Sequence, residues 1–291
     1  MFKYNYYRAK NSLDVCEQLL KYKEKAHIVA GGTDIMVQIR ERDQKWKVLE
    51  CLIDITALEP ELRYVKEEEK QIHIGALCTH TDLEESKVIQ TFFPFLGVAC
   101  ATVGSPLIRN RGTIGGSICN ASPAADPLTP LIATDTKVVI QGMTGTREVS
   151  LKEFYLGKGK IDLQDGEYLR EFIVQKLPEN VHTQFVKLGR RKALAISRLN
   201  VSVALVMDAQ GMITEARIAP GCIFVKPDRV QRAEQVVIGK IPSIEVFKEA
   251  GTAVSDVMIE RTGVRWSTEY KQPAVEGIVE EALLKAAGME G

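Results

Sequence analysis

The sequence lacks the paired cysteines and spaced histidines from which most protein metal sites are built. Its six cysteines stand singly, and no two of them share the Cys-x-x-Cys spacing of zinc and iron–sulfur sites. The four histidines show no ligand spacing such as His-Glu-x-x-His. We therefore predict no metal or cluster in this chain. We interpret His73 as a strand residue, His80 as a loop residue and most cysteines as small buried side chains in a reducing compartment.

Net charge and long apolar runs are also missing. Lys and Arg total 38, as do Asp and Glu, so no global field directs the chain onto nucleic acid or an anionic membrane. No stretch approaches the roughly 20 apolar residues of a membrane span. Residues 1–7 (MFKYNYY) lack the apolar core of a signal peptide. We expect a cytoplasmic protein with no nucleic-acid and no membrane partner.

Three common signatures of nucleotide binding and catalysis are absent. The chain contains no Gly-x-Gly-x-x-Gly fingerprint after a strand, no phosphate loop ending in Gly-Lys-Ser or Gly-Lys-Thr, and no Gly-x-Ser-x-Gly elbow. The string GKGK at 157–160 lacks the hydroxyl residue and the spacing of a phosphate loop, so we interpret it as a surface loop. A chain without a nucleophile of its own is expected to hold an organic cofactor that carries the chemistry.

Two short glycine-rich strings, at 30–34 (AGGTD) and 113–117 (TIGGS), are the most informative feature that is present. Each lies in or after an apolar stretch and is followed by a run that can open a helix. Glycine permits tight turns and close approach, so backbone amides would be left free to meet a diphosphate. Two such loops facing one another could clamp an extended dinucleotide. The alternative interpretation is a plain loop between elements.

The hydrophobic spacing divides the chain into three units, at 1–57, 58–177 and 178–291. Between the second glycine string and the next helix, residues 120–127 (NASPAADP) are small and polar enough to wrap around a ligand. The expected elements are strands at 27–30, 50–55, 72–77, 185–188, 201–207 and 213–218, and helices at 92–103, 128–133, 229–237, 243–254 and 275–287.

These strings also resemble a known family. The segments 28–34 (IVAGGTD), 74–76 (IGA), 108–116 (IRNRGTIGG) and 185–187 (FVK), with Arg190 and Arg191 following, are similar in order and spacing to the FAD-binding subunits of molybdenum hydroxylases, the xanthine dehydrogenase family. Nicotinate and carbon monoxide dehydrogenases have related subunits. The resemblance runs over nearly the whole chain.

The resemblance implies an α+β fold. A flavin-binding module of two subdomains (the PCMH-type FAD-binding fold), at 1–57 and 58–177, would hold FAD between its halves, and a C-terminal α/β flavoprotein domain would follow at 178–291. No catalytic residue is expected. The family pattern places these residues around the diphosphate and ribityl part of FAD: Ile28, Val29, Ala30, Gly31, Gly32, Thr33, Asp34, Ile35, Gly112, Thr113, Ile114, Gly115 and Gly116.

Three further positions match the family pattern one by one. Asp126 would hydrogen-bond a cofactor hydroxyl or fix the loop, and Leu169 and Lys187 match positions near the isoalloxazine ring. The Lys187 cation beside the ring would stabilise an anionic reduced flavin. The alternative interpretation of Lys187 is a solvated lysine on a strand. Where some relatives place an aromatic against the adenine, this chain has Val103, so that stacking contact is not expected.

The implied function is electron transfer within a complex. A molybdopterin subunit and a 2Fe-2S subunit would be partners, in a dimer of heterotrimers. Electrons would pass through FAD to NAD+, with a quinone or another carrier as the alternative acceptor. Xanthine or a related purine is the expected substrate, with nicotinate and carbon monoxide dehydrogenase as alternatives. Two other hypotheses stay open: a nucleotide-binding assembly module without a redox role, and an oxidase of the same flavin fold that turns over substrate alone.

Overall fold

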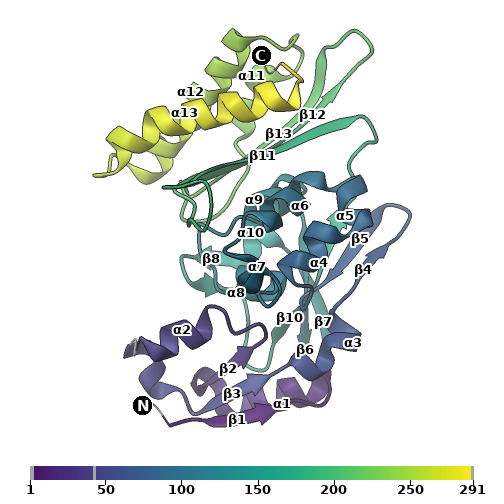
Figure 1. Cartoon of the computed structure of the whole chain (residues 1–291), viewed down its shortest axis with the longest axis vertical. Helices are drawn as coiled ribbons and strands as arrows, with labels where there is room; N and C mark the ends of the chain where they lie inside the picture. The colour runs from purple at the N-terminus through teal and green to yellow at the C-terminus, as the bar shows by residue number, and fades with distance from the viewer. Residues whose placement is uncertain (1–2, 42–43, 290–291) are drawn as a thin grey trace.

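The computed structural model describes residues 3–41 and 44–289, so the outermost ends of the first and third expected units lie outside the described residues. Three main β-sheets follow one another along the long axis of the molecule, with the N-terminal sheet at one end and the C-terminal helices at the other (Figure 1). Among the described residues, no helix is long and apolar enough to cross a membrane. The mixed helix-and-sheet class expected from the sequence is confirmed.

The N-terminal part is built on a parallel three-stranded sheet in the order β1-β3-β2. Central strand β3 buries all four of its residues, and Ile53 pairs with Tyr7 on one side and Ile28 on the other. Its elements are β1 (Asn5–Arg8), α1 (Ser12–Tyr22), η1 (Lys23–Lys25), β2 (Ala26–Val29), α2 (Ile35–Arg40), η2 (Gln44–Val48), β3 (Cys51–Asp54), η3 (Thr56–Leu58) and α3 (Glu59–Leu62). Because β2 ends at Val29, the first glycine string lies at the carboxyl edge of this sheet.

The middle part centres on an antiparallel five-stranded sheet in the order β4-β5-β10-β6-β7. Its strands are β4 (Val65–Glu67), β5 (Gln71–Gly75), β6 (Lys137–Gly142), β7 (Gly145–Ser150) and β10 (Tyr168–Gln175), and β8 (Tyr155–Gly157) and β9 (Lys160–Ile161) form a separate hairpin. Its helices are α4 (His80–Glu85), α5 (Lys87–Phe92), α6 (Pro94–Ala101), α7 (Pro106–Arg109), α8 (Ile114–Cys119), α9 (Leu128–Ala133) and α10 (Leu151–Phe154). Sheet and helices share one apolar core that includes Phe95, Ile114 and Phe172.

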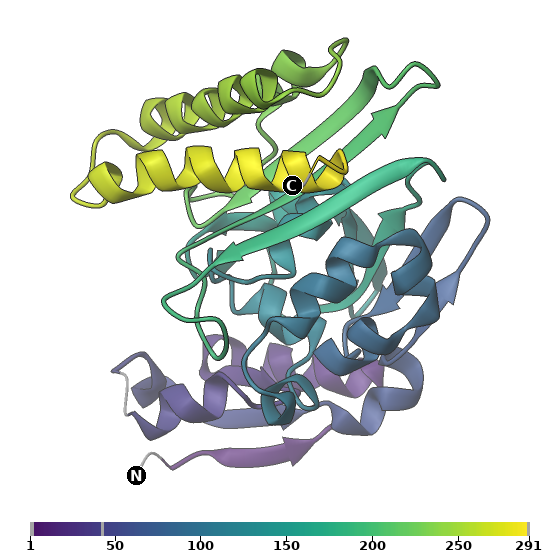
Figure 2. The ribbon, with the colours of Figure 1, turned by 45° about the horizontal axis from the view of Figure 1, so that its top comes forward.

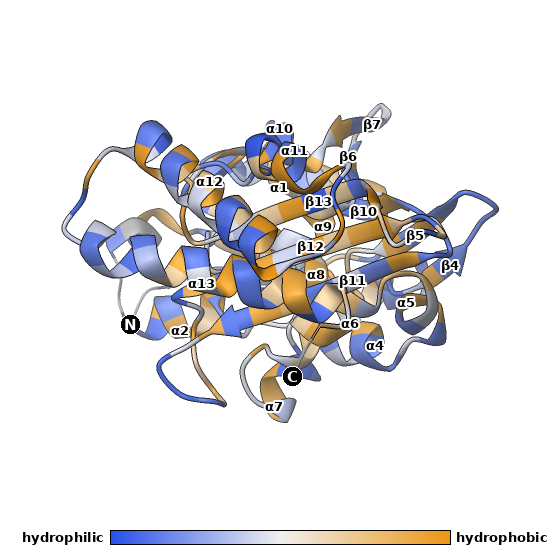
Figure 3. Cartoon of the chain, turned by 90° about the horizontal axis from the view of Figure 1, so that it is seen from above, coloured by the Kyte–Doolittle hydropathy of each residue, from blue (hydrophilic) through white to orange (hydrophobic). Residues whose placement is uncertain are grey.

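The C-terminal part is an antiparallel sheet in the order β11-β12-β13, covered on one face by helices. The two long helices lie side by side across the strands (Figure 2), and β12 and β13 are largely apolar beneath them (Figure 3). Its elements are β11 (Val181–Leu188), β12 (Leu199–Met207), β13 (Ile213–Gly221), α11 (Gln231–Val237), α12 (Ile244–Thr262) and α13 (Thr268–Ala286). Ser243 caps α12, and Gly263, with φ of 67°, ends it.

The structure corrects three of the expected elements. The helix expected at 92–103 is the shorter α6, Pro94–Ala101; Phe93 separates it from α5, because the residue before a proline disfavours helical backbone. The helix expected at 275–287 begins at Thr268 and carries Pro273 in its first two turns. The second glycine string is not a loop, since Thr113 is an N-cap and α8 begins at Ile114 within the string.

Candidate functional site

The first glycine string presents a row of unused backbone donors. From Gly31 to Ile35, the five successive N–H groups donate to no group in the part of the chain that the structure describes. Gly32 has φ of 75°, a backbone conformation that side chains rarely adopt, and it turns the chain from β2 towards α2. Consecutive free amides in such a turn form an anion-binding concavity.

The backbone of the first glycine string touches the backbone of Arg111 and Gly112, immediately before the second string. A Cβ on Gly31 would lie only 1.8 Å from the Arg111 carbonyl oxygen and 3.0 Å from the Gly112 Cα. Only glycine permits this approach, because any side chain at position 31 would overlap the second segment. The structure therefore brings the two predicted strings together, from the N-terminal sheet and the middle part, as a dinucleotide clamp requires.

The amides of the second string are already in use. Ile114 N–H donates to the Cys78 carbonyl at 2.9 Å, and Gly115 N–H to the Ala76 carbonyl at 2.9 Å. Gly116 N–H donates to Thr113 Oγ1 at 3.1 Å, which is the N-cap bond of α8. The expectation that these three amides are free is therefore wrong. Two of them bind the start of α8 to the segment after β5, and the third forms the N-cap bond. The Thr113 N–H has no partner among the described residues.

Asp126 lies at the centre of a buried polar network. The residue is 5% exposed, and Oδ1 accepts from Ser197 Oγ at 2.5 Å and Asn200 Nδ2 at 3.0 Å. Oδ2 accepts from Lys187 Nζ at 2.5 Å and Thr102 Oγ1 at 3.2 Å. Of the two roles expected for Asp126, these bonds favour fixing the loop, since both carboxylate oxygens are taken by the protein.

Lys187 and Leu169 are not solvated surface residues. Lys187 Nζ also donates to the Thr102 carbonyl at 3.0 Å, so its cation is held between the middle part and β11 rather than standing free on a strand. Leu169 lies on β10, is 4% exposed and belongs to the central apolar core. Contacts of either side chain with a flavin ring stay a prediction.

His80 lies beside Gly112 at this junction, although the sequence pattern predicts it in a loop. The structure places it at the first position of α4, not in a loop, and leaves it only 3% exposed. Burial, with a smaller contribution from the positive charge of Arg109, lowers the pKa of His80 to about 4. The signal was available, because Thr79 and Asp82 form the reciprocal capping box that starts a helix at His80.

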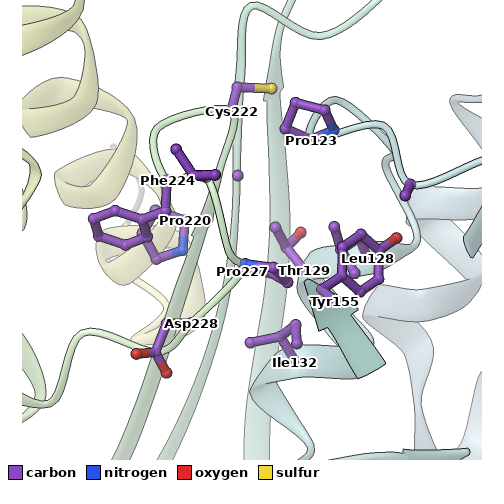
Figure 4. Close-up of a pocket in the computed structure, with 13 residues that line it drawn as sticks. Pro123, Leu128, Thr129, Ile132, Tyr155, Pro220, Cys222, Phe224, Pro227 and Asp228 are labelled. Carbon is purple, nitrogen blue, oxygen red and sulfur yellow. The ribbon is translucent and has the colours of Figure 1, made fainter. Parts of the chain in front are cut away.

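A separate small pocket lies between α9, the β8–β9 hairpin and the segment after β13 (Figure 4). Leu128, Tyr155 and Pro220 are among its lining residues. Its free volume of about 10 Å³ holds roughly one water molecule, so it is no dinucleotide site. Among residues 3–41 and 44–289, no three His, Cys, Asp or Glu side chains are placed to hold a metal ion.

Comparisons with known proteins agree with this geometry. Residues 2–176 match the family described as FAD binding domain in molybdopterin dehydrogenase, and residues 184–286 match the CO dehydrogenase flavoprotein C-terminal domain. The nicotinate dehydrogenase FAD-subunit of Eubacterium barkeri is 34% identical over 260 residues, covering 88% of this chain and 86% of the relative. The xanthine dehydrogenase FAD-binding subunit of Escherichia coli O157:H7 is 30% identical over 290 residues, covering 98% and 97%.

The fold is shared with solved structures as well. A chain of the carbon monoxide dehydrogenase from Hydrogenophaga pseudoflava, in a form that lacks the Mo-pyranopterin moiety of the molybdenum cofactor, superposes with a TM-score of 0.90 at 26% identity, with 99% of each chain covered. Fold and site thus define a flavoprotein subunit of an oxidoreductase. The chain belongs to the family of FAD-binding subunits of molybdenum hydroxylases.

Proposed function

We propose that this chain binds one FAD at the junction of the two glycine strings. The observation that carries the proposal is the row of unpartnered N–H groups from Gly31 to Ile35, which suits a diphosphate. The Thr33 hydroxyl and the His80 ring pack closely around Gly112 at this junction, because a Cβ there would lie 3.4 Å from Thr33 Oγ1 and 3.2 Å from His80 Cδ2. Main chain at 28–35 and 112–116 then surrounds the diphosphate and ribityl part, and Leu169 and Lys187 lie towards the isoalloxazine ring.

The proposed role of the bound FAD is electron transfer between partner subunits and a soluble acceptor, since flavin exchanges electrons both singly and in pairs. The partners are a molybdopterin subunit and a 2Fe-2S subunit, assembled as a dimer of heterotrimers, with NAD+ as the final acceptor. The chain's own contribution is to bind and orient the FAD. The family membership and the full-length match to a dehydrogenase subunit support this assignment.

The substrate proposed for the complex is an N-heterocycle, with xanthine or a related purine as the first to test. The relatives named for nicotinate and xanthine dehydrogenases, at 34% and 30% identity, support the class. Carbon monoxide is the alternative, supported by the solved carbon monoxide dehydrogenase. Reduction of the flavin in the purified complex by xanthine, nicotinate or carbon monoxide, each added separately, distinguishes the three.

The proposal also includes a division of the chain into three units and a cytoplasmic location. The separate sheets support units at 1–57, 58–177 and 178–291, with the FAD between the first two. The six free cysteines support a reducing, cytoplasmic compartment. Limited proteolysis should cut first between β10 and β11, near residue 178.

The test of FAD binding is the absorption spectrum of the chain after incubation with FAD and desalting. We expect flavin bands and one acid-releasable FAD per chain. An assembly module without a redox role predicts a colourless protein, both alone and in the co-purified complex. An oxidase of the same fold predicts substrate turnover with oxygen by the isolated chain, which the electron-transfer proposal does not.

A further inference from the structure

Around the junction of the two glycine strings, one buried ring has no hydrogen-bond partner. Neither ring nitrogen of His80 bonds to a described residue, and Nδ1 is sealed from solvent. Its main-chain N–H, in contrast, donates to the Gly112 carbonyl at 3.0 Å, which fixes the start of α4 against the second string. The ring is thus held rigidly in place without an interaction inside the chain that accounts for a polar side chain there.

The Cδ2 edge of the ring packs against Gly112, at the junction where we propose that FAD binds. A Cβ on Gly112 would lie 3.2 Å from His80 Cδ2, 3.4 Å from Thr33 Oγ1 and 3.1 Å from the Ile108 carbonyl oxygen. In the imidazole ring Cδ2 is bonded to Nε2. The ring edge that packs against Gly112 is therefore the edge that carries Nε2. Thr33 Oγ1 and the N–H groups of the first string, also without partners, complete the same junction.

The protonation state of His80 suits a single hydrogen bond rather than an ion pair. Because burial and Arg109 hold its pKa near 4, the imidazole is neutral at physiological pH and carries one N–H. Nδ1 is enclosed without an acceptor, and an unused lone pair there costs less than an unused N–H. The tautomer with the proton on Nε2 therefore keeps an unused donor at the junction of the two segments.

We propose that His80 is a further cofactor-binding residue, whose Nε2–H donates a hydrogen bond to an oxygen of the bound dinucleotide at the junction of Gly112 and Thr33. The inference rests on the proposed FAD binding. It assigns to a residue outside both glycine strings a share in positioning the diphosphate and ribityl part, and it explains why an unpartnered histidine ring is buried at the start of α4.

The test is the FAD dissociation constant of the full chain, measured by quenching of flavin fluorescence. We expect His80→Leu to weaken FAD binding about tenfold, the range of one lost hydrogen bond to a phosphate or hydroxyl oxygen. His80→Gln, which restores an amide donor, should recover most of the affinity. The matched control is His182→Leu on β11, an exposed histidine, which should bind FAD like the wild type.

The outcomes distinguish the role of His80 from the proposed binding of FAD. A wild-type chain that binds no FAD, alone or in its complex, overturns the proposed function itself. A wild type that binds FAD, with His80→Leu binding equally well, overturns only the role of His80. If His80→Leu fails to fold, the ¹⁵N shift of the His80 ring in the wild-type chain decides: a change on adding FAD supports the hydrogen bond, and an unchanged shift refutes it.

Discussion

Lys187 Nζ lies 2.5 Å from Asp126 Oδ2. Lys187 is on β11 of the C-terminal sheet, and Asp126 lies just before α9 in the middle part. The pair is almost completely buried, with side chains 13% and 6% exposed. A buried ion pair persists only when further hydrogen bonds satisfy both partners, and here Ser197, Asn200 and Thr102 do so. The pair therefore fastens the C-terminal part to the loop that follows the second glycine string.

Replacing Asp126 by Asn should destabilise the chain markedly. The change keeps the shape but leaves the Lys187 ammonium buried without its counter-charge, so the free energy of unfolding should fall by about 3 kcal/mol. Urea denaturation of the flavin-free chain measures this fall. Asp165→Asn, at an exposed position, is the control and should change little. Equal stability of the two variants would show that the Lys187–Asp126 pair contributes nothing net.

Replacing Lys187 by Met should lower the midpoint potential of the bound flavin more than it lowers FAD occupancy. Asp126 keeps its bonds from Ser197, Asn200 and Thr102, but its negative charge is then uncompensated. A negative charge near the ring disfavours an anionic reduced flavin, so the midpoint potential should fall on the order of tens of millivolts.

A spectroelectrochemical titration of the FAD-loaded Lys187→Met chain, with FAD content measured in parallel, tests this prediction. Lys240→Met, at an exposed turn residue before α12, is the matched control and should keep the wild-type potential. An unchanged potential at full FAD occupancy in Lys187→Met would return Lys187 to a purely structural role.

Replacing Gly31 by Val should separate the two glycine strings. The Cβ of the introduced valine would lie 1.8 Å from the Arg111 carbonyl oxygen. Because that oxygen belongs to the backbone, no change of side-chain rotamer can relieve the overlap. We expect a loss of stability of at least about 3 kcal/mol and loss of FAD content. Gly277→Ala, on α13 with open space around it, is the control and should stabilise the chain by up to about 1 kcal/mol. Full FAD content in Gly31→Val would contradict the clamp.

The sequence predicts the two glycine strings and that they lie close together, but not which of their backbone N–H groups are free to bind a ligand. Glycines after a strand and the family pattern identify both segments, and the parallel sheet carries the first to its edge. Which amides stay free depends on long-range partners: the carbonyls of Ala76 and Cys78 occupy those of Gly115 and Ile114. Gly115→Val should therefore disturb folding as well as FAD binding, because its Cβ would lie 2.6 Å from the Ala76 oxygen.

Element boundaries were predictable where a local signal marks them. The helix at 128–133 was placed at its observed bounds, and the strands of the C-terminal sheet were placed to within a few residues. The network of Asp126, Lys187, Ser197 and Asn200 spans up to 74 residues of sequence, and no pattern within one segment could reveal it. Burial of His80 has the same origin, since the covering segments come from elsewhere in the chain.

His80 should make the stability of the flavin-free chain fall as the pH decreases from about 6.5 to about 4. In the unfolded chain histidine binds a proton near pH 6.5, whereas burial and Arg109 lower the pKa of folded His80 to about 4. Between these values the unfolded state binds the extra proton, so stability is fully present above pH 6.5 and is lost towards pH 4, by roughly 3 kcal/mol in total. Urea denaturation at half-unit pH steps measures the slope.

The variant that isolates this effect is His80→Gln, which has no titrating group at the position. The difference in unfolding free energy between wild type and variant should change with pH only in this window and be constant above pH 7, because there both folded and unfolded His80 are neutral. His182→Gln, at an exposed histidine on β11, is the matched control. A constant difference between wild type and His80→Gln from pH 4 to pH 8 would mean that His80 titrates normally, and hence that its ring is open to water rather than enclosed behind Gly112.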